Sequence, residues 1–194
     1  TTADLIWLRE SGLEAAILKL AAVGTPVLGI CGGYQMLGEV LEDPDGVEGT
    51  LRRIKGMGLL PCSTVFAPEK IRTRVRAETT GGRLGGAALD GYEIHMGLTQ
   101  VRGEPICRLA SGLEDGCRQG NVLGTYLHGF FDAPELRDRL VSLLLARRGL
   151  TWTGETGPED GQAYREEQYD KLAAALRASL DMEAVYRILE RGLD

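Results

Sequence analysis

The chain has 194 residues, which suffices for one α/β domain of ordinary size and a small appendage. Its hydrophobic content of 43% and charged content of 26% are typical of a globular protein in water. The net charge of -6, with arginines scattered along the chain, argues against a nucleic-acid-binding protein. No apolar run approaches the roughly 20 residues of a membrane span, and the first residues lack a signal pattern. We therefore expect a cytoplasmic protein that binds neither nucleic acid nor membrane.

The cysteines argue against both disulfides and metal. Four are present, far apart and without a C-x-x-C pair, at positions 31, 62, 107 and 117. With only two histidines in the chain, a zinc site would need an unusual ligand set. We expect reduced thiols and no metal site.

The chain opens with two helical patterns. The first runs from Thr2 to Arg9, with Thr2 as its expected cap. Residues 11–14 form a capping-box pattern that starts a second helix over residues 13–22, which ends before Gly24. Because a doubly wound α/β domain normally begins with a strand, we expect further strands upstream of these residues.

The central motif spans residues 25–38. Residues 26–30 predict a short strand buried on both faces, and Cys31 follows it directly. An apolar periodicity then predicts a helix, marked by Tyr34, Leu37, Val40 and Leu41. Glycines at 29, 32 and 33 surround the cysteine, which is the pattern of a nucleophile elbow, where any Cβ would clash. The helix N-terminus would favour the thiolate and bind an oxyanion. The alternative is a buried structural cysteine.

Two further segments predict strands with titratable side chains. Residues 91–97 form a strand that places Glu93 and His95 on one face, and residues 121–129 form a buried strand that ends on His128. Upstream, residues 71–78 alternate strictly, which predicts a strand with arginines outside and apolar residues in the core.

The C-terminal part predicts helices separated by a linker. Pro134 fits the first turn of a helix that Gly149 closes. Residues 151–162 are rich in glycine, acid and threonine, and two amphipathic helices follow, the last capped by Asp181. We therefore expect a catalytic domain over residues 1–150, and a linker and helical tail packing on it over residues 151–194.

Cys31 and His128 both fall at strand ends, where open α/β sheets bind their ligands. A thiol is mostly protonated at pH 7, so a nucleophilic cysteine needs a base beside it. That base is His128 or His95, and the position of His128 at a strand exit favours it. The alternative for His128 is a satisfied interior histidine. For Glu93 and His95 a structural hydrogen-bond pair is the favoured interpretation.

Three segments resemble the glutaminase domain of cobyric acid synthase, in the class I glutamine amidotransferase superfamily. They are GICGGYQMLG at 29–38, GYEIHMG at 91–97 and GTYLHGFFD at 124–132. Residues 165–181 also resemble the C-terminal tail of that family. The resemblance implies a flavodoxin-like, doubly wound, mostly parallel sheet without its N-terminal strands. It also implies that a loop before Ala3 supplies a second oxyanion donor, so that residues 1–194 alone would be slow and poorly stable.

The resemblance also implies roles for individual residues. Cys31 would be the nucleophile and His128 its base, while the oxyanion and substrate would be bound by Gly32, Gly33 and Gln35. Glu93 and His95 would support the site. Many relatives have a His-x-Glu pair, but position 130 here is Phe. Asp132 or Glu93 would then orient His128.

The function implied is hydrolysis of L-glutamine through a cysteine thioester, with ammonia passed to an N-terminal synthetase domain. That domain would use ATP and Mg2+ to amidate adenosylcobyrinic acid a,c-diamide in cobalamin biosynthesis, and the glutaminase domain itself would need no cofactor. Three alternatives remain: a sister glutaminase serving cell-wall lipid amidation, a catalytically silent interaction module, and a cysteine peptidase on the same sheet.

Overall fold

The computed structural model describes residues 1–151 and 161–192, in two compact units that divide near residue 152. Each unit is described by itself. The first contains four helices and a short 3-10 turn among its described residues: α1 Thr2–Glu10, α2 Leu13–Ala22, α3 Gly32–Leu37, η1 Gly82–Leu84 and α4 Pro134–Arg147. Its strands are β1 Val27–Ile30, β2 Val40–Glu42, β3 Arg53–Lys55, β4 Cys62–Thr79, β5 Ala88–Val101, β6 Cys107–Leu109, β7 Glu114–Asp115, β8 Cys117–Gln119, β9 Val122–Thr125 and β10 Leu127–His128.

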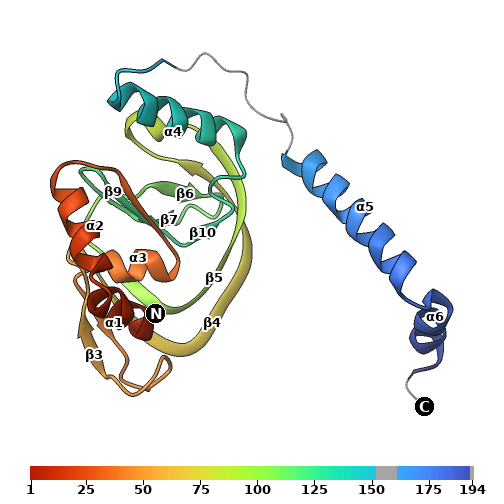
Figure 1. Ribbon diagram of the computed structural model, residues 1–194. Coiled ribbons are helices and arrows are strands. Elements are labelled where there is room, and N and C mark those ends of the chain that lie inside the picture. The colour runs from red at the N-terminus through yellow and green to blue at the C-terminus, as the bar shows by residue number, and fades with distance from the viewer. Residues whose placement is uncertain (152–160, 193–194) are drawn as a thin grey trace. The chain divides into compact units, whose positions relative to one another are not determined.

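The strands form two sheets. The smaller has the order β1-β9-β8, and the larger has the order β10-β5-β4-β2-β3, with β6 on β4 and β7 on β6. Figure 1 shows β4 and β5 as a long curved pair that wraps one side of this unit. The α/β class is confirmed, but the sheets are mixed. Within the described residues only β1–β9 and β2–β4 pair in parallel. The expectation of a mostly parallel sheet is therefore wrong.

The expected strand over residues 121–129 is two strands in different sheets. β9 pairs with β1, and the chain crosses at Tyr126 before β10 pairs with β5. A continuous apolar run cannot reveal such a crossing, because both strands are buried. The crossing matters for the site, since it brings the strand that ends on His128 away from the sheet that positions Cys31.

Three helix expectations need correction. The N-cap of α1 is Thr1, not Thr2, and it makes no side-chain cap hydrogen bond. The helix after Cys31 ends at Leu37, and Val40 lies in strand β2 instead. The second helix begins with Gly12 at φ 79° as its N-cap, without a side-chain cap. Glu14 does not close a capping box; its Oε2 forms an ion pair with Arg9 Nε at 2.7 Å. By contrast, Pro134 lies in the first turn of α4, as expected.

Apolar packing holds α3 against the small sheet. Tyr34 and Leu37 of α3 are buried in one cluster with Val122 of β9 and the crossing residue Tyr126. The rings of Tyr34 and Tyr126 meet edge to face, with centroids 5.1 Å apart. This packing positions the start of α3, and therefore Cys31.

The second unit contains α5 Gly161–Ser179 and α6 Met182–Arg191. The Asp181 side chain caps α6 as expected, accepting a hydrogen bond of 3.0 Å from the Ala184 amide. Most of the expected linker, residues 152–160, lies outside the described residues. Packing of this tail on residues 1–150 stays a prediction. In the described part of the chain no helix is long and apolar enough to span a membrane.

Candidate active site

Cys31 lies in a strained turn between β1 and α3. Its backbone has φ 54° and ψ -115°, and it is the one non-glycine residue with positive φ in the described part of the chain. Such backbone costs of order 1–3 kcal/mol and persists where the surrounding structure enforces it. Here the Cys31 amide donates to the Thr125 carbonyl at 2.8 Å, and the Cys31 carbonyl accepts from the Gln35 amide at 3.1 Å. The backbone at Cys31 therefore has the strained strand-to-helix geometry expected of a nucleophile elbow.

The three glycines around Cys31 differ in the space that a Cβ would have. A Cβ on Gly29 would lie 2.6 Å from Leu37 Cδ1 and 2.7 Å from the Gly33 carbonyl, so this position excludes any side chain. A Cβ on Gly32 would lie 3.2 Å from Thr1 Oγ1, which is tight. A Cβ on Gly33 would meet nothing within 4 Å. The expectation of a clash at all three positions is therefore wrong for Gly33, where the space is open.

The Cys31 thiol is half-buried. Its Sγ donates to the Ile94 carbonyl of β5 at 3.3 Å. Burial raises the pKa of Cys31; the Gly32 amide directed at the sulfur lowers it, and Glu48 raises it again. The expectation that the helix start favours the thiolate is thus only partly met, because desolvation outweighs one amide. Activation requires a further group or a change on substrate binding.

His128 and Cys31 both contact strand β5. His128 pairs with Tyr92 of β5, and the two rings stack in parallel with centroids 4.9 Å apart. Cys31 Sγ contacts Ile94, two residues further along β5, a spacing of about 7 Å. His128 Nε2 is buried without a hydrogen-bond partner among the described residues. Direct contact of the two groups stays a prediction.

His95 lies on the opposite face of β5 from Tyr92, because their spacing of three places them on alternate sides. Its ring stacks on Tyr126 with centroids 3.6 Å apart. Burial lowers the pKa of His95, and nearby His128 lowers it further. Glu93 shares this face, and burial followed by the nearby Asp115 charge raises its pKa. The geometry favours the supporting role that we expect for both residues.

Gln35 is 3% exposed, and its amide is occupied. Its Nε2 donates at 3.0 Å to both the Met96 carbonyl and the Tyr126 hydroxyl, and its Oε1 accepts from Thr1 Oγ1 at 3.3 Å. These contacts tie α3 to β5 and to the crossing between the sheets. They favour a structural role for the side chain over the expected substrate-binding role.

Asp132 is exposed at the turn after β10. Its amide donates to the Gly129 carbonyl at 2.8 Å, and its Oδ2 lies 3.5 Å from where a Cβ on Gly129 would be. Phe130 is 3% exposed and packs in the core. Orientation of His128 by Asp132 stays a prediction.

Asp115 is a buried structural residue at the crossing between the sheets, and the sequence does not reveal its role. It is 6% exposed and accepts from Thr125 Oγ1 and, at 3.2 Å, from the Tyr126 amide. Thr125 Oγ1 in turn accepts from the Leu127 amide at 3.0 Å. Asp115 thereby fixes the crossing between β9 and β10. In the sequence, Asp115-Gly116 is indistinguishable from an ordinary turn.

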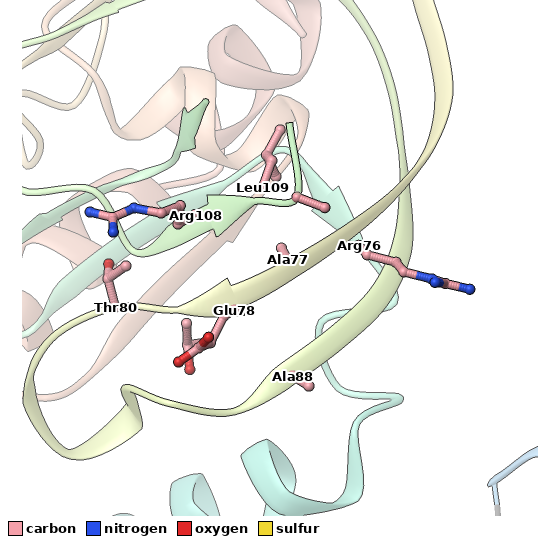
Figure 2. Close-up of a pocket in the computed structure, with 9 residues that line it drawn as sticks. Arg76, Ala77, Glu78, Thr80, Ala88, Arg108 and Leu109 are labelled. Atoms are coloured by element: carbon pink, nitrogen blue, oxygen red, sulfur yellow. The ribbon is translucent and has the colours of Figure 1, made fainter. Parts of the chain in front are cut away.

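The surface also has a hollow whose lining includes neither Cys31 nor His128. Figure 2 shows this hollow, of about 380 Å³ and lined in part by Arg76, Glu78 and Arg108 of β4 and β6. Arg76 and Arg108 approach Asp90 and Glu114 at 3.9 and 3.8 Å. Among the described residues no three His, Cys, Asp or Glu side chains gather as metal ligands would.

A strained cysteine between a strand and a helix, with a histidine at the end of a strand in the other sheet, is compatible with cysteine-dependent acyl transfer. The chain belongs to the CobB/CobQ-like glutamine amidotransferase domain family, whose profile matches residues 1–136.

Curated relatives are considerably longer than this chain. It is 46% identical over 208 aligned residues to a cobyric acid synthase of Ruminiclostridium cellulolyticum, covering 100% of this chain and 40% of the relative. A cobyric acid synthase of Lachnoclostridium phytofermentans is 44% identical, with 100% and 41% covered. A solved glutamine amidotransferase structure is 22% identical with a TM-score of 0.45, covering 74% of this chain and 71% of that one.

Proposed function

We propose that this chain hydrolyses L-glutamine to glutamate and ammonia through a thioester on Cys31. The observation that supports the proposal most directly is the Cys31 backbone, held at positive φ with the Gly32 amide directed at its sulfur. A strained elbow persists only where the fold enforces it, and an amide aimed at the nucleophile is a ready oxyanion donor.

The first step is acyl transfer. The Cys31 thiol gives its proton to His128, and the thiolate attacks the side-chain amide carbon of glutamine. The Gly32 amide stabilises the oxyanion of the tetrahedral intermediate. His128 returns the proton to the leaving nitrogen, so that the carbon–nitrogen bond breaks and ammonia departs. Water then hydrolyses the thioester, releasing glutamate and restoring the thiol.

We further propose that the ammonia serves an ATP-dependent synthetase that amidates corrinoid carboxylates in cobalamin biosynthesis. The cobyric acid synthase relatives support this, since the chain spans only about 40% of their length. The synthetase activity would then belong to another part of the full-length protein.

The test is glutamate release from L-glutamine by the full-length protein and by its Cys31→Ala variant. We expect the variant to lose hydrolysis, while Cys107→Ala, at a thiol buried in the core far along the chain, retains it. Equal rates for Cys31→Ala and the parent would overturn the mechanism. Cleavage of peptides without glutamine hydrolysis would support a peptidase instead.

A further inference from the structure

The middle of β4 has an unpaired hydrogen-bonding edge. One edge of β4 pairs with β5, and the other pairs with β2 as far as Val65 and with β6 from Ala77 onward. Among the described residues no strand pairs with this second edge over residues 70–76, which span about 23 Å at ~3.3 Å per residue. Figure 1 shows this part of β4 along the outer margin of the curved β4–β5 pair. We call residues 70–76 the open edge.

The backbone groups of alternate residues on the open edge point away from β5. The Arg76 carbonyl accepts from the amide of Ala110, which follows β6, at 2.8 Å, so it points away from β5. Because direction alternates along an antiparallel strand, Arg72 and Arg74 direct their amide and carbonyl groups to the same side. No strand pairs with these groups in the described part of the chain, and the Arg74 carbonyl accepts from the neighbouring Thr73 hydroxyl at 3.3 Å. Such a row of backbone groups is a template for another strand.

One face of the open edge is cationic, although the whole chain has a net charge of -6. The exposed side chains that alternate along this face are those of Lys70, Arg72, Arg74 and Arg76. Across residues 1–151 and 161–192 the guanidinium groups of Arg72 and Arg74 make no hydrogen bond or ion pair. Arg76 approaches Asp90 at 3.9 Å, and Figure 2 shows it extending outward from β4. Carboxylates beside Arg72 and Arg74 would therefore be attracted without displacing a partner.

The other face of the open edge is partly apolar. Ile71 and Val75 are half-buried, and Val75 packs against the buried cluster that contains Ala77. A hollow of about 360 Å³ lies at this end of the edge, lined by Arg74, Val75, Arg76, Asp90 and Ala110. Its lining combines both faces of β4 with a residue that follows β6, so the hollow lies beside the unpaired strand.

The charge pattern selects the occupant of the open edge. Two copies of this edge paired antiparallel would place arginines opposite arginines on one face, which is destabilising. An extended segment with carboxylates at alternate positions would instead place them opposite Arg72 and Arg74, with its apolar side chains beside Ile71 and Val75. Strand addition of this kind combines main-chain hydrogen bonds with selection of alternate side chains.

We propose that the open edge binds, as an added strand, an extended segment of the full-length protein outside residues 1–194 in which acidic and apolar side chains alternate. The cobyric acid synthase relatives have most of their length outside the part that matches this chain. A segment from that part would be tethered and therefore present at a high effective concentration. The inference rests on the proposed synthetase elsewhere in the protein, and does not depend on glutamine hydrolysis at Cys31.

Amide hydrogen exchange resolved by residue, in the full-length protein, tests the added strand. We expect the amides of Arg72 and Arg74 to be protected, as are those of Thr73 and Val75, which face β5. In the double variant Arg72→Glu and Arg74→Glu, the amides at positions 72 and 74 should exchange at least about tenfold faster, because attraction becomes repulsion. Unchanged protection at Thr73 and Val75 would show that the sheet is intact.

Two matched variants separate charge at the open edge from charge elsewhere. The double variant Arg72→Lys and Arg74→Lys keeps both charges and should keep the protection. Arg83→Glu reverses an exposed arginine in η1, outside the open edge, and should keep it too.

Photo-crosslinking identifies the occupant. With p-benzoylphenylalanine in place of Thr73, we expect a crosslink within one full-length chain, to a peptide outside residues 1–194 in which acidic residues alternate. Mass spectrometry of the digested protein locates that peptide. A crosslink between two copies, or one to a peptide within residues 1–194, would overturn the proposed occupant.

Fast exchange at positions 72 and 74 in the parent protein would overturn the added strand. Protection that survives the charge reversal would overturn the acidic character of the segment. If glutamate release still depends on Cys31 in either case, the proposed function stands and only this inference fails. Glutamate release independent of Cys31, with a protected open edge, would overturn the proposed mechanism alone.

Discussion

At the scale of single residues, two glycines near Cys31 differ in whether a side chain would fit. Gly29 faces the Gly33 carbonyl where a Cβ would need to be, whereas Gly33 faces open space. The first glycine makes the elbow possible by close backbone approach. The second faces open space, so a Cβ there would meet no neighbouring atom within 4 Å.

Substitution of these glycines should therefore have opposite effects. Gly29→Ala must move Leu37 or the start of α3, and we expect a loss of about 1–3 kcal/mol in the free energy of unfolding. Gly33→Ala should be neutral or slightly stabilising, because alanine favours a helix by up to about 1 kcal/mol over glycine. Urea denaturation of both variants measures this. Equal destabilisation would contradict the distinction, whereas stable Gly33→Ala protein with impaired turnover would place substrate in that space.

At the scale of elements, β5 separates the two histidines by face. His128 shares a face with Tyr92 and lies near the strand position that Cys31 contacts, while His95 stacks on Tyr126 on the other side. We expect His128→Ala to lower kcat for glutamine about 10²-fold or more, through loss of acid–base catalysis.

The matched variant is His95→Phe, which keeps an aromatic ring against Tyr126. We expect it to retain kcat within about tenfold, because the His95 ring stacks on Tyr126 on the face of β5 opposite to His128. Steady-state glutaminase assays of the two variants provide the comparison. A larger loss in kcat for His95→Phe than for His128→Ala would exchange the two roles.

The crossing between β9 and β10 depends on the Asp115 carboxyl. Burial raises the pKa of Asp115, so the folded state retains its proton at pH values where the unfolded chain has released it. Stability should therefore decline as pH rises from about 4, the ordinary carboxyl pKa, through the raised value. Asp115→Asn cannot titrate and should show a shallower decline.

Urea denaturation between pH 4 and 7 tests this, with Asp45→Asn as a control at an exposed carboxylate in the loop after β2. The control should decline as the parent does. A slope for Asp115→Asn equal to that of the parent would show that Asp115 contributes nothing to the pH dependence.

At the scale of the whole molecule, the chain spans about 40% of the length of its cobyric acid synthase relatives. If ammonia is made at Cys31 and consumed elsewhere, the two steps can be separated. In the full-length protein, Cys31→Ala should abolish amidation that uses glutamine and leave amidation that uses an ammonium salt. Corrinoid product formation with each nitrogen source measures this. A variant inactive with both would contradict a separate synthetase site.

The sequence by itself determined the α/β class, the strand–cysteine–helix order and the helix starts at Pro134 and Asp181. These depend on neighbours within a few residues, such as apolar periodicity and capping side chains, which local sequence encodes. The motif around Cys31 also sufficed to predict a strained turn.

Only the tertiary structure decided which faces meet. The split of residues 121–129 between two sheets, the role of Asp115 and the separation of His128 from His95 all depend on pairing between distant strands. The raised pKa of Cys31 has the same origin, because burial by other elements outweighs the local amide of Gly32. Strand register and desolvation are long-range properties, and a local pattern does not specify them.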